Sequence, residues 1–413
     1  MSKGIVSFGV YVPKYRVKRE DIAKAWGGRA RGEISIAHPN EDSATMAAEA
    51  AYTALQRSGL DPEQIDALYM ATDSAPYIEH SLARATADTL RMKPEADVAD
   101  FSTSPRAGAV ALKSCLDAVG SGRIKYGLVA ISDSRPVSAG SDEELSFGAG
   151  ATAFLVGNSG VIAEVEDTYT WSTYLVDSWR EAGANSVHSH EPRFTREFGY
   201  SQHVIEATRG LLGKLKRNIR DYSHAVLQYH PDEKVMRGVA RTLGITPEQI
   251  GKGNIGAGTG DTGAASVPLG LAAVLEEAKA GERILLVFYG SAAGEAMSLV
   301  VTSEAERARS RGQSLNSYLN SKDYIDYLSL AKMRGLLQKA ETPGRTWVSP
   351  LSPSWYRDGA VIRRLVGARC TECGYVNFPP TMRRICIRCG NTKFDEVLRS
   401  RRGKVHTFCV NIY

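Results

Sequence analysis

Two hydrophobic periodicities alternate along residues 4–303. Runs rich in apolar residues, typical of strands, are followed by stretches in which small and apolar residues recur every three to four positions, as on one helix face. Strands that alternate with helices indicate a layered α/β fold, and their similar order in residues 1–165 and 166–345 suggests two related halves. The predicted strands are 5–13, 65–74, 126–134, 148–158, 160–170, 224–231 and 282–303, the last folded as a hairpin, and the predicted helices are 42–59, 105–122, 198–222, 233–244 and 265–281.

Polar residues and glycines sharpen some of these boundaries. Asp42 or Ser43 is expected to cap the N-terminus of the first predicted helix, and Gly59 its C-terminus. The strands 148–158 and 160–170 follow a glycine-rich opening and lie close in sequence. They are predicted to pair as a hairpin.

The composition changes after Thr302. Residues 304–341 are charged and helical in pattern, and we expect them to pack on the main body. Residues 342–359 carry Pro, Ser and Trp and are typical of a connector. We place a domain boundary near residue 345, so that 346–413 holds a linker and a separate small domain.

Charge and hydropathy exclude two classes of protein. The net charge of +5 is spread along the chain, which argues against a nucleic-acid-binding arm. No apolar run approaches the roughly 20 residues of a membrane helix, and the first residues lack the core of a signal peptide. We expect a cytoplasmic protein that binds neither membrane nor nucleic acid, with at most a basic rim for an anionic cofactor.

Four of the six cysteines form two C-x2-C pairs that are twelve residues apart. A glycine follows each pair, Gly374 and Gly390, and permits the tight turn that directs two thiolates at one ion. Four thiolates suit tetrahedral zinc with no open position, so the predicted site is structural. The expected ligands are Cys370, Cys373, Cys386 and Cys389.

The C-terminal segments "PSWYRDG", "LVGARCTECG" and "VNFPP" resemble the thiolase-associated zinc-ribbon/OB-fold proteins. Residues 403–413 are predicted to form one β-strand. An OB barrel needs five strands, so the resemblance implies only the start of an OB-fold within these 413 residues. Either the chain is cut short or the rest of that domain lies beyond it.

The first 340 residues or so resemble the 3-hydroxy-3-methylglutaryl-CoA (HMG-CoA) synthase branch of the thiolase superfamily, close to ketoacyl synthase III. The resemblance implies a five-layered α/β/α/β/α fold, commonly dimeric, with an acyl-CoA site where the two halves meet. It rests on the segments "DIAKAWGG", "EDSATMAAEAA", "ATDSAPY", "SFGAGATAFLVG", "EPRFTREFGYSQHVIEA", "GDTGAASVPLGLAAVL" and "FYGSAAG".

The family's nucleophilic Cys, at the N-terminus of a buried helix, aligns with Pro105 here. Proline suits a first helical turn but cannot form an acyl-enzyme. Ser104 is adjacent and is a substitute nucleophile only with a positioned base. Cys115 lies too far along the same helix and is expected to be a buried apolar residue.

The resemblance assigns the remaining catalytic positions as well. Asp73 replaces the family's Glu and is expected to act as the acid/base, unless it only caps a turn. At the family's His the alignment places Tyr229, with His230 one step on; in a strand only one of them faces the site, and we favour Tyr229. Asp261 stands where the family has an Asn of the oxyanion hole.

Contacts with CoA and the thioester are also implied. The side chains of Lys234 and Arg237 would meet the CoA phosphates, although a solvated helix face explains them equally well. Glycine-rich loops would approach the thioester closely. Their candidate residues are Gly260, Gly263, Gly290 and Ser291.

Without the cysteine, three functions stay open. The first is aldol or retro-aldol chemistry on a noncovalently bound acyl-CoA, which needs only a base and donors that stabilise an enolate. The second is a non-catalytic subunit that scaffolds a partner thiolase or acyltransferase through the zinc module. The third is Claisen-type acyl transfer through Ser104 or by direct attack on a bound CoA ester.

Overall fold

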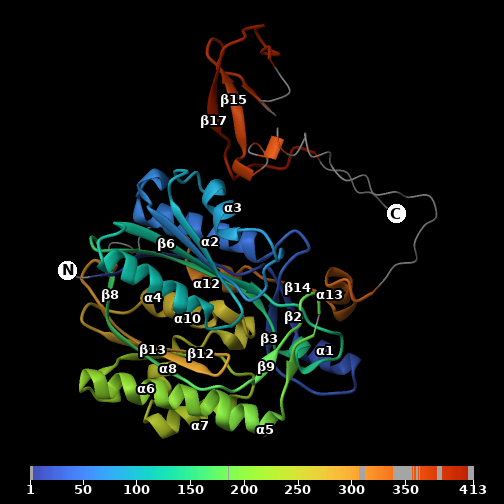
Figure 1. Cartoon of the computed structure of the whole chain (residues 1–413). Coiled ribbons are helices and arrows are strands. Elements are labelled where there is room, and N and C mark those ends of the chain that lie inside the picture. The colour runs from blue at the N-terminus through green and yellow to red at the C-terminus, as the bar shows by residue number, and fades with distance from the viewer. Residues whose placement is uncertain are drawn as a thin grey trace. The chain divides into compact units, whose positions relative to one another are not determined.

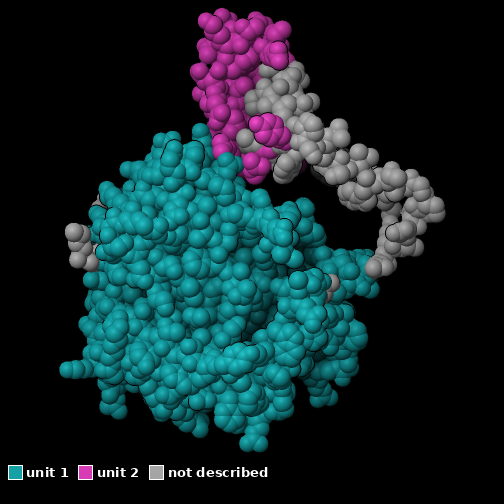
Figure 2. Space-filling model, viewed as in Figure 1, with its two compact units in different colours: residues 1–339 teal, residues 340–413 magenta. Residues whose placement is uncertain are grey.

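The computed structural model describes residues 3–184, 186–306, 312–337, 363–378 and 384–407, together with residues 356, 358, 359 and 361. The chain divides into two compact units, residues 1–339 and residues 340–413, drawn in teal and magenta in Figure 2. The division of the first unit at residue 165 stays a prediction. None of the helices described is long and apolar enough to cross a membrane.

A nine-stranded mixed sheet forms the frame of the first unit. Buried residues on alternate faces of its strands belong to different hydrophobic clusters, which is the period-two pattern of a sheet covered on both sides. The strands, in spatial order, are β11 (His224–Leu227), β12 (Arg283–Gly290), β13 (Ala293–Val301), β8 (Ala163–Ser172), β1 (Gly4–Tyr11), β7 (Ala149–Gly157), β6 (Tyr126–Ser134), β4 (Ala67–Ala71) and β5 (Asp97–Phe101).

The two halves of the sheet form two layers, and helices lie on both outer faces and between the halves. The unit therefore has the predicted five-layered, thiolase-like architecture (Figure 1). Helices α2 (Ser43–Ser58) and α3 (Leu82–Thr89) pack on one outer face, and α6 (Gln202–Leu215) and α7 (Glu233–Leu243) on the other. Between them lie α4 (Ala107–Gly120) and α10 (Ser266–Leu275), which share one core with both halves of the sheet.

The predicted hairpin of residues 148–158 and 160–170 is wrong. Strands β7 and β8 do form in these segments, but β1 lies between them and pairs antiparallel with both. The pairing of β1 with β8 involves only Gly4 and Ile5, so the two halves of the sheet meet at a short link. Closeness in sequence therefore did not decide which strands pair.

The remaining segments of the first unit are mostly short. Asp42 caps α2 by accepting a hydrogen bond from Thr45 N at 2.8 Å, and Gly59 ends it at φ 74°, as predicted. Residues 304–341 do not form one helix: the described part holds two short helices and a two-residue strand. The other elements are β2 (Tyr15–Lys18), β3 (Glu33–Ile36), β9 (Ser178–Trp179), β10 (His188–Ser189), β14 (Asp323–Tyr324), α1 (Arg19–Ala25), α5 (Pro192–Phe194), the π-helical turn Thr195–Ser201, α8 (Pro247–Gly251), α9 (Gly256–Thr259), α12 (Leu315–Asn320) and α13 (Tyr327–Met333).

The second unit contains a small antiparallel sheet. Strand β15 (Val366–Cys370) pairs with β16 (Val376–Asn377) on one side and β17 (Phe394–Leu398) on the other. The predicted strand 403–413 is not seen over residues 403–407, which are exposed and form no strand. Residues 408–413 lie outside the described residues, so the predicted OB-fold strand is not supported.

Candidate active site and metal centre

The turn before α4 meets the loop between β12 and β13. A Cβ atom on Gly290 would lie 2.4 Å from Ser104 Oγ and 3.1 Å from Pro105 Cδ, so the two segments touch at this glycine. Pro105 lies in the turn just ahead of the helix rather than in its first turn, because α4 begins at Ala107. Ser104 Oγ accepts a hydrogen bond from Arg106 N at 3.2 Å and contacts no base within the described residues. Position 105 offers no nucleophile, and Ser104 has no activating partner there.

Gly290→Ala is expected to destabilise the first unit by about 1–3 kcal/mol, because the new methyl group would also approach the backbone nitrogen of Arg106 to 2.9 Å. Gly213→Ala is the matched control. It lies in α6 with open space around its Cβ position, and should be neutral or stabilise by about 0.5–1 kcal/mol. Thermal unfolding of both variants checks this, and equal melting temperatures would contradict the close approach.

Cys115 is the buried apolar residue that the sequence predicted. Its side chain is fully buried, and its Sγ would lie 2.4 Å from a Cβ atom on Gly127. Burial raises the pKa of the Cys115 thiol to about 12. It therefore cannot replace a catalytic thiolate at the helix entrance.

We expect Cys115 to resist alkylation by iodoacetamide at pH 8 in the folded protein and to react fully in guanidinium, because its thiol is both inaccessible and protonated. Peptide mass spectrometry measures the modified fraction at this residue. Rapid labelling of Cys115 in the native state would show that the thiol is accessible after all.

Asp133, at the end of β6, organises the loops around Asp73. Its Oδ1 accepts hydrogen bonds from Asp73 N at 2.7 Å, Ser74 Oγ at 2.7 Å and Thr72 Oγ1 at 2.9 Å. Its Oδ2 accepts one from Ala264 N at 2.7 Å. The carboxyl group is fully buried, and this burial raises its pKa. Asp133 thus ties the loop after β4 to the loop before α10.

The Asp73 carboxyl group takes no part in the hydrogen bonds of Asp133, which binds the backbone nitrogen of Asp73 instead. It makes no hydrogen bond or ion pair within the described parts of the chain, while the Asp73 carbonyl accepts one from Arg180 Nη2 at 3.0 Å. Burial, and next the charge of Asp133, raise the pKa of Asp73 to about 6. A free carboxyl group with this pKa both accepts and returns protons near neutral pH.

The Asp261 carboxylate forms an ion pair with Arg135 and does not serve as a hydrogen-bond donor. Its Oδ2 lies 2.6 Å from Arg135 Nη2, and both side chains are largely buried. Its Oδ1 accepts a hydrogen bond from Gly263 N at 3.0 Å, and its backbone pairs with Ser146 and Gly148. The carboxylate therefore places a fixed, compensated negative charge near Asp73.

The prediction that Tyr229 and His230 lie in a strand and face opposite sides is wrong. Strand β11 ends at Leu227, and both residues lie in the loop after it. The Tyr229 hydroxyl accepts a hydrogen bond from Arg19 Nη2 at 3.0 Å, and burial raises its pKa. His230 accepts one from Asp232 N through Nδ1 at 3.1 Å, which leaves the proton on Nε2. Burial lowers the pKa of His230, so it is a neutral donor.

Ring contacts connect His230 to the Gly290 loop. The ring centroids of His230 and Tyr200 are 4.9 Å apart, and those of Tyr200 and Tyr289 are 5.5 Å apart. Tyr289 directly precedes Gly290. Burial still holds the pKa of His230 below its usual value, although the charge of Asp261 acts in the opposite direction.

The predicted loop glycines make close approaches that a side chain would prevent. Gly263 has φ 57°, and a Cβ atom there would lie 2.3 Å from Asp133 Oδ2. Gly260 has φ 77°, and its Cβ would lie 2.7 Å from the Ser146 carbonyl oxygen. Ser291 has φ 50°, and its Oγ donates to the Thr103 carbonyl at 3.4 Å.

The predicted phosphate contacts lie on α7. Lys234 and Arg237 are both exposed there. Lys234, together with Arg196, lines a surface cavity of about 440 Å³ between α7 and the π-helical turn. Arg237 does not line this cavity, and its Nε donates to the Glu233 carbonyl at 3.4 Å.

Sequence reasoning missed Asp133 and Arg135. The sequence signal for them was an acidic residue and a basic residue at the carboxyl end of the largely apolar strand β6. Ligands of α/β proteins bind at the carboxyl ends of the strands.

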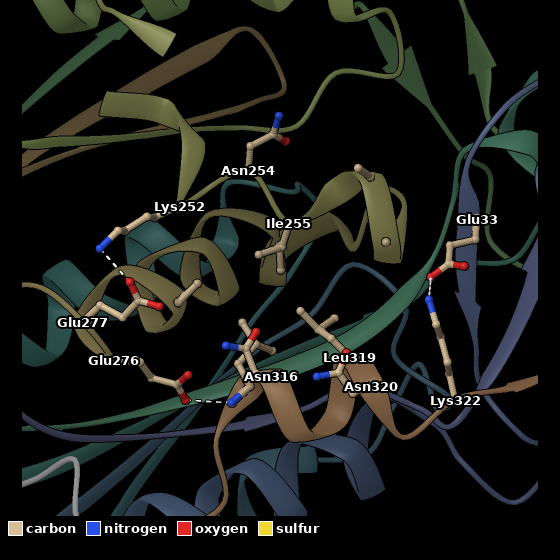
Figure 3. Close-up of a pocket in the computed structure, with 14 residues that line it drawn as sticks. Glu33, Lys252, Asn254, Ile255, Glu276, Glu277, Asn316, Leu319, Asn320 and Lys322 are labelled. Carbon is tan, nitrogen blue, oxygen red and sulfur yellow. Dashed lines mark hydrogen bonds and ion pairs between the residues drawn. The ribbon is translucent and has the colours of Figure 1, made fainter. Parts of the chain in front are cut away.

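A second cavity, of about 370 Å³, lies away from these groups (Figure 3). Its charged side chains already have partners. Glu33 pairs with Lys322 at 2.7 Å and Lys252 with Glu277 at 2.6 Å, and Glu276 accepts a hydrogen bond from Leu315 N. We assign no chemistry to it.

The four predicted zinc ligands converge in the second unit. The Sγ atoms of Cys370, Cys373, Cys386 and Cys389 all lie within 4.8 Å of one another. Zn–S bonds of about 2.3 Å in a tetrahedron place sulfur atoms about 3.8 Å apart, so the cluster fits zinc. Each pair sits on a tight turn, with Gly374 N donating to the Cys370 carbonyl and Gly390 N to that of Cys386. The site is structural because all four positions are thiolates.

Known proteins match both units. A family model described as ChsH2, rubredoxin-like zinc ribbon domain covers residues 357–395. The hydroxymethylglutaryl-CoA synthase of Methanopyrus kandleri is 38% identical over 344 residues, which are 81% of this chain and 98% of the relative. That of Methanocaldococcus jannaschii is 38% identical over 340 residues, 80% of this chain and 98% of the relative.

Solved structures share the fold at lower identity. An HMG-CoA synthase complexed with CoA has a TM-score of 0.74 and 20% identity, and covers 85% of this chain and 95% of its own. MvaS in complex with 3-hydroxy-3-methylglutaryl coenzyme A has a TM-score of 0.71 and 21% identity, and covers 84% and 95%. Together with its five-layered fold, these relatives show that the chain belongs to the hydroxymethylglutaryl-CoA synthase family and carries a zinc ribbon after the family's core.

Proposed function

We propose that the first unit forms or cleaves a carbon–carbon bond in an acyl-CoA by aldol or retro-aldol chemistry, without an acyl-enzyme. The observation that carries this proposal is the free Asp73 carboxyl group, with a pKa of about 6, in a segment whose Thr72 N donates to the carbonyl of Phe101, four residues before Pro105. A base is retained where the thiol of the family is missing. Covalent acyl transfer needs that thiol, whereas enolate chemistry does not.

In the cleavage direction, the Asp73 carboxylate would take the proton of a 3-hydroxyl group. The C2–C3 bond then breaks, C3 leaves as a carbonyl, and the electron pair becomes the thioester enolate. Protonated Asp73 returns the proton to C2. Two groups are our candidate donors to the enolate oxygen. Nε2 of His230 carries a proton, and the Tyr229 hydroxyl accepts a hydrogen bond from Arg19 and keeps its own proton free to donate.

CoA as the carrier is supported by the two solved relatives that hold CoA or its HMG thioester. Lys234 and Arg196 at the 440 Å³ cavity are our candidates for its phosphates. Arg237 has weaker support, because it does not line the cavity.

The test has two parts. Acyl-CoA added to the full chain should leave its intact mass unchanged, and a panel of 3-hydroxyacyl-CoAs should include one that releases a shorter acyl-CoA. Independently, the enzyme should exchange the C2 protons of a bound acyl-CoA with deuterium from solvent. An acyl adduct on Ser104 would instead support the Claisen-type alternative.

The second candidate is a non-catalytic subunit, favoured by the same proline and by the added zinc ribbon. It predicts no deuterium exchange by the isolated chain and activity only with a co-purifying thiolase or acyltransferase.

A further inference from the structure

Arg135, the ion-pair partner of Asp261, also lines a cavity of about 300 Å³ that Asp73 does not line. It is lined by β3 and the loop after it, the loop after β6, the start of β7 and the end of α13. None of these segments carries the groups assigned above to proton transfer, and Arg135, which pairs with Asp261, is the one residue they share with the groups described around Asp73. The cavity is therefore adjacent to the candidate active site without being part of it.

Arg334 brings a positive charge to this cavity, and the fully buried Glu144 compensates this charge in part, since it raises the pKa of Arg334. Arg334 makes no ion pair within 4 Å among the residues that the structure describes, and its Nη1 is buried without a hydrogen-bond partner. Among the described residues, the hydrogen-bond partner of its Nη2 is the Phe147 carbonyl, at 3.5 Å. Burial lowers the pKa of Arg334 to about 10, so it is charged at neutral pH. A buried guanidinium in this state is costly unless an anion completes its contacts.

Arg135 lies beside it. The Arg135 guanidinium stacks on the Phe147 ring, with Cζ 3.6 Å from the centroid, so both arginines contact one residue. Nη2 of Arg135 holds Asp261, but its Nε has no hydrogen-bond partner within the described chain. Phe147 thus orients the Arg135 guanidinium, and both arginines line the same cavity, an arrangement suited to a planar anion.

The other walls limit what fits. Val137, Phe147 and Met333 are apolar, and His38 carries its proton on Nε2 because Nδ1 accepts a hydrogen bond from Asn40 N. Glu41 is the opposing negative charge, and its carboxylate is already bound by the Tyr11 hydroxyl and His38 N. The cavity therefore combines an apolar wall with two guanidinium groups.

We propose that this cavity binds a carboxylate carried by a substrate of the reaction, with Arg334 as its main partner. This deepens the proposed function, on which it rests, by naming the substrate class. The carboxylate belongs either to the acyl chain of the CoA thioester or to a free carboxylic acid that is the second reactant. In both cases Arg135, which pairs with Asp261, would border the bound anion as well.

Calorimetric titration of the full chain tests this with pairs of thioesters of equal length: succinyl- against butyryl-CoA, glutaryl- against valeryl-CoA, and adipyl- against hexanoyl-CoA. At least one dicarboxylic member is expected to bind about tenfold more tightly than its neutral counterpart, since charge-assisted hydrogen bonds contribute on this scale. Arg334→Met should remove the preference without changing the Kd of CoA itself, and Arg334→Lys should retain part of it.

A second variant guards against misfolding of the first. Met333→Glu places a carboxylate in the cavity and leaves Arg334 in place, and it too should abolish the preference. If free glutarate binds in an Arg334-dependent manner while the thioester pairs bind equally, the anion is the second reactant. Equal Kd values together with no Arg334-dependent binding of glutarate would overturn the inference. Deuterium exchange into valeryl-CoA, measured in parallel, would show whether the proposed function stands without it.

Discussion

Asp73→Asn is expected to lower deuterium exchange into a bound acyl-CoA, and cleavage of a 3-hydroxyacyl-CoA, by about 10²–10⁴-fold, the range typical of a lost general acid/base. The amide keeps the size of the side chain but neither accepts nor returns a proton. Asp73→Glu should restore part of the rate, because it keeps a carboxyl group that can accept and return a proton. Exchange is followed by mass spectrometry of the thioester at saturating concentration.

Stability separates this role from a structural one. The folded protein raises the pKa of Asp73 from 3.8 to about 6, so ionised Asp73 disfavours the folded state at pH 7. Asp73→Asn should therefore raise the melting temperature at pH 7, and this gain should disappear as the pH falls below about 4. A melting temperature of Asp73→Asn below that of the wild-type protein at pH 7 would contradict the proposed role, because the loss of activity would then follow from a loss of stability.

The pH profile follows from the same group. Removal of the C2 proton needs the Asp73 carboxylate, so the exchange rate in the wild-type protein should rise with pH through about 6 and then level off. A rate that is unchanged between pH 5 and pH 8 would assign the base to another residue.

Removing zinc is expected to unfold the second unit and leave the first unit folded. Structural zinc contributes about 10–16 kcal/mol to folding in small zinc domains, and the described sheet of this unit has only three short strands. Chelation by phenanthroline, or Cys386→Ser, should open residues 363–407 to limited proteolysis, while the melting temperature of residues 1–339 stays within about 2 °C.

Cys115→Ala is the matched control, since it removes a cysteine that lies far from the cluster in the sequence and is buried in the first unit's core. Zinc content by plasma mass spectrometry should be one per chain in the wild-type protein and in this variant, and should be lost in Cys386→Ser. Protease resistance of residues 363–407 in metal-free protein would contradict a folding role for the ion.

Most of the fold was predictable from local sequence. Helix α2 begins and ends at its predicted caps, β6 spans Tyr126–Ser134 as predicted, and β12 and β13 form the predicted hairpin. The exceptions were pairing and length: β1 separates β7 from β8, and β11 ends before Tyr229. Pairing depends on which apolar faces share a core, and the local pattern does not contain that information.

The candidate site was predictable only in part. Hydrogen bonds of Asp133 join the loop of Asp73 to the turn of Gly263, whose backbone nitrogen donates to Asp261, while the assignment of these residues to a site remains a proposal. Asp133 was missed because its partners include Ala264 N, 131 positions away. The pKa of Asp73 was not readable either, since it depends on burial and on the charges of Asp133 and Arg135.

The sequence by itself determined the zinc site, because two C-x2-C pairs with following glycines bring four thiolates together through local turns alone. It also determined that position 105 is a proline, which carries no nucleophilic side chain. Only the tertiary structure decided what remains: a free carboxyl group beside a buried anchor, and two guanidinium groups that share Phe147. Burial and long-range neighbours set the charge and the partners of these groups, and no local pattern encodes either.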